Sequence, residues 1–308
     1  MSPAAAPAIH TLALSKRYGH VEALRGLTMT VPRGEIFGFL GPNGAGKTTA
    51  VKLLLGLSQP TGGEAWVLGE PVGTPSTRRH VGYLPELFRY QAWLTALEVL
   101  QLHARLIGLP RRERAPAVEP VLTAVGLAAR ARDRIGTFSK GMQQRLGLAV
   151  AMLGSPRLIF LDEPTSALDP VGRHDVREII RGLRSDDVAV FLNSHLLSEV
   201  EQICDRVAVI DHGSVVAGGT LAEVLTGADS VRMQVTEVRG GPAAVLAPFG
   251  AVEQSGDWCT VRGVDPARVP AMVAELVRHG GQVHAVEPRR QSLEDRFLEL
   301  LGGGRETQ

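Results

Sequence analysis

The most constraining feature of the chain is a glycine-rich segment between a buried strand and a helix. Residues 41–48 read Gly-Pro-Asn-Gly-Ala-Gly-Lys-Thr and match the pattern G-x-x-x-x-G-K-[ST] at every fixed position. The apolar run 35–40 precedes the segment, and apolar residues with helical spacing follow it from Lys47 to Leu55. Backbone N–H groups of such a loop turn inward onto phosphate oxygens, and the helix N-terminus adds partial positive charge. The sequence therefore predicts a site for a nucleoside triphosphate.

Each position of this segment has an expected task. We expect Lys47 to reach the β- and γ-phosphates and the Thr48 hydroxyl to bind Mg²⁺. A glycine-rich turn that carries a lysine by coincidence is the alternative, and the flanking strand and helix argue against it. The remaining phosphate contacts are expected from Gly41, Pro42, Asn43, Gly44, Ala45, Gly46 and Thr49.

A second apolar run, residues 157–162, ends in the adjacent acids Asp162 and Glu163. At the carboxyl end of a parallel strand, such side chains point into the crevice where α/β sheets bind ligands. We expect Asp162 to serve the Mg²⁺ ion, and Glu163 to orient or deprotonate the attacking water. A solvated acid pair before a turn-forming proline is the alternative, which the phosphate loop upstream makes the weaker one.

Strands and helices alternate along most of the chain, which predicts a parallel α/β sheet. Residues 9–33 alternate apolar and polar positions between turn signals and are typical of short antiparallel strands. Further buried strands are expected at 35–40, 81–84, 157–162 and 188–193, and helices at about 95–108, 116–130, 140–153 and 172–184.

The segment between the lysine and the acids resembles a family motif. Residues 138–146 read Phe-Ser-Lys-Gly-Met-Gln-Gln-Arg-Leu and are similar to the signature of ATP-binding cassette (ABC) ATPases, usually Leu-Ser-Gly-Gly-Gln. Ser139 and Gly141 keep two of its residues, and Lys140 replaces its first glycine. A serine-capped helix N-terminus is a ready anion site. The resemblance implies that Ser139 and Gly141 contact the γ-phosphate held by a second subunit.

Other elements of the family follow in the expected order. Residues 166–169, Ser-Ala-Leu-Asp, are similar to the D-loop and assign Asp169 to the site of the partner copy. His195 takes the place of the switch histidine, and Tyr18 that of the aromatic residue that stacks on adenine. Each of these matches is weak alone, but their common order and spacing favour the family over coincidence. The resemblance covers about residues 9–225.

One position departs from the family pattern. Glu86 stands where the family usually has the glutamine of the Q-loop. The resemblance still implies that Glu86 approaches Mg²⁺ or the attacking water. Unlike the usual glutamine, it would do so as a charged hydrogen-bond acceptor. Glutamate at this position resembles the ATPases that serve ABC-2-type exporters.

An aromatic cluster follows at residues 87–94, Leu-Phe-Arg-Tyr-Gln-Ala-Trp-Leu. One interpretation is local core packing, because aromatic residues are commonly buried. The sharper interpretation is a groove that receives a short helix of a membrane partner, since exposed apolar patches mark interfaces.

The pattern changes past about residue 225. A β-β-α-β-α order predicts a small α+β module, joined by a glycine-rich linker around Gly218, Gly219 and Gly227. Residues 292–300 resemble the last helix of the small domain that often ends ABC-2 exporter ATPases. We see no catalytic constellation in residues 226–308, and prefer a packing or dimer-stabilising appendage, with a regulatory role as the alternative.

Composition excludes several classes of protein. Lys+Arg is 33 and Asp+Glu is 32, so the net charge of +1 gives no electrostatic case for nucleic-acid binding. We expect Cys204 and Cys259 to be buried free thiols, because their spacing fits neither a disulfide framework nor a zinc site. No apolar run is long enough for a membrane span, and no signal peptide is expected.

The resemblance implies a fold, a function and partners. The expected fold is the α/β P-loop fold of ABC ATPases, with a parallel-sheet core, an antiparallel β subdomain and a helical subdomain at about 87–155. Residues 1–225 would form the cassette and residues 226–308 the small α+β domain. The implied function is ATP hydrolysis with Mg²⁺ by a peripheral subunit on the cytoplasmic face of a bacterial membrane. It would pair head to tail with a second copy and drive a separate ABC-2-type permease.

Three alternatives stay open at this point. The first is an ABC ATPase that acts on ribosomes or DNA, although the chain holds one cassette and the spacing from Lys47 to Asp162 leaves no room for a long coiled coil. The second is the ATPase of an importer, against which Glu86 and residues 226–308 argue mildly. The third is a degenerate nucleotide-binding scaffold, against which the intact Glu163 and His195 argue.

Overall fold

The structure is a computed structural model, and it describes residues 6–166, 168–184, 188–225, 230–289 and 292–302. The chain divides into two compact units, residues 1–220 and 221–308. Among the described residues, no helix has the length and apolar character that crossing a bilayer requires.

A six-stranded sheet forms the centre of the first unit, in the order β10-β9-β3-β8-β7-β6. Its strands from β9 to β6 run parallel, and β10 pairs antiparallel with β9 at one edge. Burial explains the apolar runs, because every residue of β3, β7 and β8 is buried. The bounds are β3 Ile36–Leu40, β6 Val81–Leu84, β7 Leu158–Asp162, β8 Ala189–Asn193, β9 Arg206–Asp211 and β10 Ser214–Thr220.

A second, antiparallel sheet has the order β2-β1-β4-β5. Its strands are β1 Ile9–Tyr18, β2 Val21–Val31, β4 Gly62–Val67 and β5 Glu70–Pro71. The two sheets share one apolar core, in which Phe39 and Phe160 each pack on Phe191 with ring centroids 5.2 Å apart.

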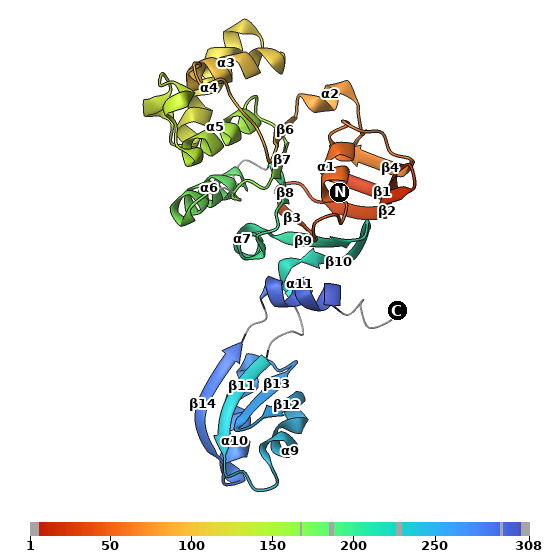
Figure 1. Cartoon of the computed structure of the whole chain (residues 1–308), viewed down its shortest axis with the longest axis vertical. Helices are drawn as coiled ribbons and strands as arrows, with labels where there is room; N and C mark the ends of the chain where they lie inside the picture. The colour runs from red at the N-terminus through yellow and green to blue at the C-terminus, as the bar shows by residue number, and fades with distance from the viewer. Residues whose placement is uncertain (1–5, 167, 185–187, 226–229, 290–291, 303–308) are drawn as a thin grey trace, which may run out of the picture. The chain divides into compact units, whose positions relative to one another are not determined.

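Helices complete the first unit. A capping box starts α3, since Thr95 accepts from the backbone N–H of Glu98 and donates its own N–H to the Glu98 carboxylate. Figure 1 shows α3, α4 and α5 gathered at one side of the central sheet and β1, β2 and β4 at another. The bounds are α1 Lys47–Leu54, α2 Pro75–Arg78, α3 Ala96–Leu106, α4 Arg111–Ala124, α5 Lys140–Met152, α6 Pro170–Leu183 and α7 Leu197–Ile203, with short 3₁₀ helices at Ala128–Arg130 and Ile135–Thr137.

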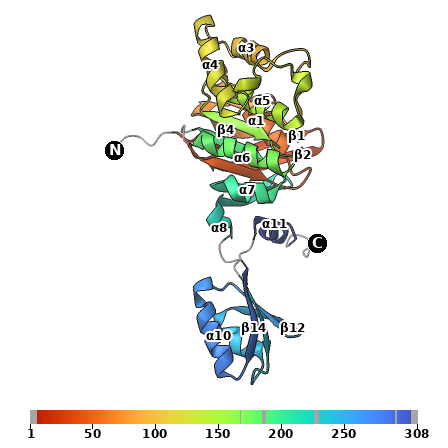
Figure 2. The same cartoon turned by 90° about the vertical axis from the view of Figure 1, so that its left-hand side faces the viewer.

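The second unit has a β-α-β-β-α-β order and the sheet order β12-β13-β11-β14, which is the ferredoxin-like arrangement. Figure 2 shows α10 lying along one face of this sheet. The buried core on that face includes Met233, Val261, Met272 and Leu276. The bounds are α8 Leu221–Leu225, β11 Ser230–Thr236, α9 Pro242–Leu246, β12 Ala251–Ser255, β13 Trp258–Arg262, α10 Val269–Arg278, β14 Gln282–Arg289 and α11 Leu293–Gly302, with 3₁₀ helices at Ala247–Phe249 and Pro266–Arg268.

The expected strands and helices of the first unit are confirmed, with one shifted helix. We expected a helix at about 116–130, but α4 occupies Arg111–Ala124. Its first turn is polar and exposed, so no apolar spacing marks its start. Cys204 and Cys259 are buried and free as expected, and burial raises the pKa of both thiols.

Two expectations for the second half of the chain were wrong. Gly218 and Gly219 lie within β10, where they pair with Ala208 and Val207, rather than in a linker. Pairing with β9 holds these glycines in the strand, although glycine has no side chain to pack and weakens a strand interior. Gly227 lies outside the described residues. The predicted β-β-α-β-α order of the C-terminal module also lacked α9 and β12, and most of β12 is exposed, so it shows no apolar alternation.

Candidate nucleotide-binding site

The loop between β3 and α1 has the geometry that phosphate binding requires. Gly44 and Gly46 have φ values of +82° and +106°, in the left-handed region that favours glycine. A Cβ atom at Gly46 would lie 2.4 Å from the Ala23 carbonyl oxygen, and one at Gly41 would lie 2.3 Å from the Ile210 carbonyl oxygen. The neighbouring strands therefore hold the loop so closely that only glycine fits at these positions.

Lys47 lies inside this loop, with 8% of the residue exposed. Its Nζ atom donates to the carbonyl oxygens of Gly41 at 2.6 Å and Pro42 at 3.1 Å. Burial lowers the pKa of Lys47, and the charges of Glu163 and Asp162 oppose that shift. The ammonium group is thus held at the first turn of α1, near the carboxylates of Asp162 and Glu163. The next residue, Thr48, is exposed.

Asp162 ends β7 opposite Asn193, its register partner at the end of β8. Asn193 Nδ2 donates to Asp162 Oδ1 at 2.6 Å, and both residues are buried. Burial raises the pKa of Asp162, and the bond from Asn193 opposes the shift. The neutral side-chain amide of Asn193 therefore orients the Asp162 carboxylate at the carboxyl end of β7.

Glu163 has a φ of +52°, a left-handed conformation that is uncommon outside glycine and is enriched at functional sites. Its backbone N–H donates to Asn193 O at 2.8 Å. Its carboxylate accepts from the backbone N–H of His195 at 3.0 Å and lies 2.7 Å from His195 Nδ1. Burial raises the pKa of Glu163, and His195 opposes the shift. The backbone N–H and the ring Nδ1 of His195 thus hold the Glu163 carboxylate, which can accept a proton.

The other predicted residues lie around this centre. Glu86 is exposed just past β6, and its charge contributes to the raised pKa values of Asp162 and Tyr83. Tyr18 ends β1 with 48% of the residue exposed, and Lys16 Nζ lies 4.8 Å from its ring centroid.

The signature residues cap a helix in their own chain. Ser139 Oγ accepts from the backbone N–H of Met142 at 3.2 Å, at the start of α5. Asp169 Oδ1 accepts from the backbone N–H of Gly172 at 2.7 Å and caps α6. A Cβ atom at Gly141 would lie 4.0 Å from Leu168 Cδ2, so the signature and the segment before α6 are neighbours. Ala167 of the predicted D-loop lies outside the described residues.

The aromatic segment is partly packed and partly exposed, and whether it forms a groove for a membrane partner stays a prediction. Phe88 and Tyr90 pack together with ring centroids 5.3 Å apart, and Tyr90 and His103 form a T-shaped pair. Leu87 and Trp93 are 87% and 71% exposed. Packing therefore accounts for two of these side chains and leaves two on the surface.

Asn193 is the residue that sequence reasoning missed. It orients Asp162 with its side chain and Glu163 with its carbonyl oxygen. The available signal was a polar residue at the end of an otherwise apolar strand, directly before Ser194 and His195. Its partner could not be named, because strand register is set by the fold.

A glycine loop around a buried lysine, beside carboxylates at the ends of parallel strands, defines a P-loop nucleoside triphosphatase core. Comparison with known proteins extends this assignment. A family profile described as ABC transporter matches residues 24–166. A solved structure described as the ATP-binding subunit of an ABC transporter is 32% identical, with a TM-score of 0.63, and the match covers 70% of this chain and 91% of that one.

Curated relatives match nearly the whole chain. An ABC transporter ATP-binding protein of Synechocystis is 39% identical over 97% of this chain and 86% of its own length. The Nod factor export ATP-binding protein I of Rhizobium sp. (strain N33) is 35% identical over 96% of this chain and 97% of its own length. The bacitracin transport ATP-binding protein BcrA of Bacillus licheniformis is 34% identical over 96% of this chain and 98% of its own length.

The chain belongs to the family of ABC transporter ATP-binding proteins. It is therefore an ATP-binding and ATP-hydrolysing subunit of an ABC transporter, and the predicted fold class is confirmed. Proteins of this family work with separate membrane components.

Proposed function

We propose that the chain is the ATPase of an ABC-2-type exporter, in which two copies enclose two ATP molecules with Mg²⁺. The observation that carries the catalytic part is the contact of Glu163 with His195 beside the buried Lys47. For the exporter part, support comes from the Nod factor export relative, which matches almost end to end, and from Glu86.

The donor groups of the site fit Mg²⁺, which prefers oxygen ligands. A hydroxyl from Thr48 and the carboxylate of Asp162 are hard oxygen donors of this kind, and Glu86 adds a nearby charge. When bound, the ion would neutralise charge on the β- and γ-phosphate oxygens. The bond from Asn193 would keep the Asp162 carboxylate oriented when the ion is bound.

The remaining residues divide the work of hydrolysis. Lys47 would exchange its two carbonyl contacts for phosphate oxygens, and Tyr18 would stack on the adenine ring. Glu163 would take a proton from the attacking water, for which its raised pKa suits a base at neutral pH. His195 turns Nδ1 to Glu163, so Nε2 is the ring nitrogen left for the γ-phosphate.

Head-to-tail pairing would complete each site from the second copy. Ser139, Gly141 and Asp169 of one copy would face the phosphate loop of the other, and two-fold symmetry gives two equivalent sites. ATP binding would close the pair and hydrolysis would reopen it. The chain would thus act as a peripheral subunit, with the 221–308 unit as an appendage to the cassette.

We expect Lys140→Gly, which restores the usual family residue, to keep ATP turnover at the parental level or raise it modestly. Lys140 is exposed in the first turn of α5, where a positive charge opposes the helix dipole, and glycine there costs about 1 kcal/mol. Steady-state phosphate release and a thermal melt measure both effects. Complete loss of turnover in a folded variant would contradict our interpretation of the signature.

The exporter assignment is tested by co-expression with the membrane protein encoded beside this gene. We expect a six-span permease that co-purifies with the chain and changes its ATP turnover. Trp93→Glu should abolish co-purification, because Trp93 is 71% exposed in the segment proposed to meet the permease. Leu106→Glu on α3, also 71% exposed, is the matched control and should co-purify. Capture of a ribosomal or DNA-bound partner instead would contradict the exporter assignment.

A further inference from the structure

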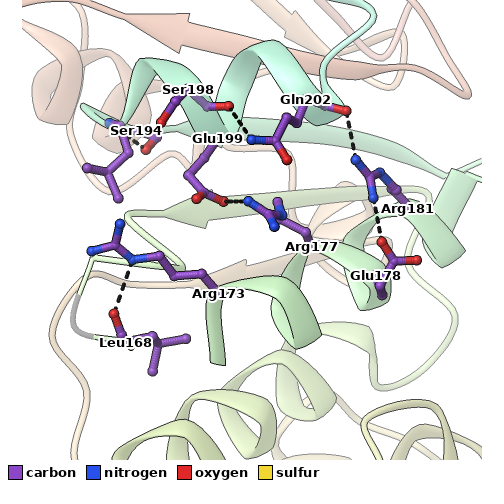
Figure 3. Close-up of polar contacts among 10 residues, drawn as sticks. Leu168, Arg173, Arg177, Glu178, Arg181, Ser194, Ser198, Glu199 and Gln202 are labelled. Carbon is purple, nitrogen blue, oxygen red and sulfur yellow. Dashed lines mark hydrogen bonds and ion pairs between the residues drawn. The ribbon is translucent and has the colours of Figure 1, made fainter. Parts of the chain in front are cut away.

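The loop that carries Asp169 and the loop that carries His195 lead directly into two neighbouring helices. α6 begins at Pro170, and α7 begins at Leu197. The two helices pack against each other, and Figure 3 shows the side chains between them. A shift of one helix along the other would therefore move one loop of the site relative to the other.

Arginines on one face of α6 supply polar contacts to this region. Arg173, Arg177 and Arg181 are four residues apart, so they lie on one side of the helix. Arg173 Nε donates to Leu168 O at 3.1 Å, in the segment just before α6, and Arg181 Nη2 donates to Gln202 O of α7 at 3.0 Å. Both ends of α6 are thus tied, one to its own loop and one to α7.

The middle arginine makes the buried contact. Arg177 Nη1 donates to Glu199 Oε2 at 2.9 Å, and the two side chains are only 14% and 9% exposed. Among the ion pairs of the described residues, no other has both partners buried to this degree. Removing one partner would leave the other charge buried without its counter-ion.

Stability alone does not explain a buried ion pair at this place. Apolar residues of similar volume hold two helices together at least as well as buried charges do. The single charge-assisted bond would be lost if either helix moved along the other, which would leave both charges buried and unpaired, so it favours one axial position of α7 on α6. The loop that carries His195 depends on such positioning. The His195 ring is 55% exposed, so little packing fixes it, yet its Nδ1 atom lies 2.7 Å from the Glu163 carboxylate.

We propose that Arg177 and Glu199 are positioning residues, whose ion pair holds α7 on α6 in the register that keeps His195 against Glu163. This proposal rests on the function proposed above for His195 and Glu163. The pair acts through the two helices and the loops they carry.

The test compares ATP turnover and nucleotide affinity in full-length Glu199→Gln and Arg177→Met. We expect kcat to fall about ten- to a hundredfold, because a displacement of about 1 Å at reacting groups has an effect of this size. KM for ATP and the affinity for ADP should stay within about twofold, since the phosphate loop is not altered. Arg177→Lys keeps the charge and should recover most of the lost kcat.

Glu178→Gln is the matched control, because Glu178 lies on the same helix, pairs with Arg181 and is 51% exposed. We expect the control to keep the parental kcat. Thermal melts of all variants give the folded fraction to which kcat is normalised. A parental kcat per folded molecule in both Glu199→Gln and Arg177→Met would overturn the proposal. So would a joint loss of kcat, nucleotide affinity and melting temperature, which would mark the pair as structural.

Glu163→Gln is measured alongside to separate two kinds of failure. An inactive Glu163→Gln together with a fully active Glu199→Gln overturns the positioning proposal alone. A fully active Glu163→Gln overturns the proposed function of Glu163, whatever the Glu199 variants do.

Discussion

Glu163→Gln is expected to lower ATP turnover by about a thousandfold while ATP binding persists. A general base contributes about 10²- to 10⁴-fold to a rate, and the amide of glutamine cannot take a proton from water. Glutamine keeps the size of glutamate and an oxygen that can accept from the His195 backbone N–H, as Glu163 does at 3.0 Å. Steady-state phosphate release, together with a titration of ATP binding, measures both results.

The matched control for this substitution is Glu64→Gln, on the exposed part of β4. It should hydrolyse ATP at the parental rate. If Glu163→Gln turned ATP over like the parent, Glu163 would not be the base, and the contact with His195 would need another explanation.

Lys47→Ala is expected to weaken ATP binding by about ten- to a hundredfold. Hydrogen bonds to charged groups contribute about 1.5–3 kcal/mol each, and phosphate oxygens would lose this ammonium. The Gly41 and Pro42 carbonyl oxygens would also lose the donor that lies inside the loop. Calorimetric titration with ATP measures the change in affinity.

Lys52→Ala is the control for this variant, because Lys52 lies about 1.4 turns further along α1 and is exposed. Its affinity for ATP should equal that of the parent. An unchanged affinity in Lys47→Ala would mean that the buried ammonium serves the loop alone and leaves the phosphates to backbone N–H groups.

Much of the first unit could be predicted because its elements carry strong local signals. β3, β7 and β8 are buried on both faces, so their sequences are apolar throughout. The glycine pattern of residues 41–48 reflects contacts that exclude any Cβ at Gly41 and Gly46. These requirements act on single positions, which is why they are visible in the sequence.

Features that depend on distant partners could not be predicted. The bond from Asn193 to Asp162 exists because parallel pairing of β7 and β8 sets these residues side by side. The pairing of Arg177 with Glu199 likewise depends on how α6 and α7 pack. The sequence alone does not show which distant residue the side chain of Asn193 or Arg177 will contact.

Exposed elements were missed for a different reason. β12 is an edge strand and most of it is exposed, so it lacks the alternation that marks a half-buried strand. The aromatic segment divided in a way that composition does not show, with Tyr90 packed and Trp93 exposed. Propensity describes such segments poorly, because tertiary contacts decide their exposure.

The central claim is that two copies of the chain share two ATP molecules, and the mass of Glu163→Gln protein in ATP and Mg²⁺ tests it most directly. Light scattering after size exclusion should give twice the chain mass of 32.9 kDa in saturating ATP, and the mass of one chain in ADP. Trapped ATP would hold the closed pair, since this variant binds but does not hydrolyse it. A mass of one chain in saturating ATP would contradict the shared sites and the roles proposed for Ser139, Gly141 and Asp169.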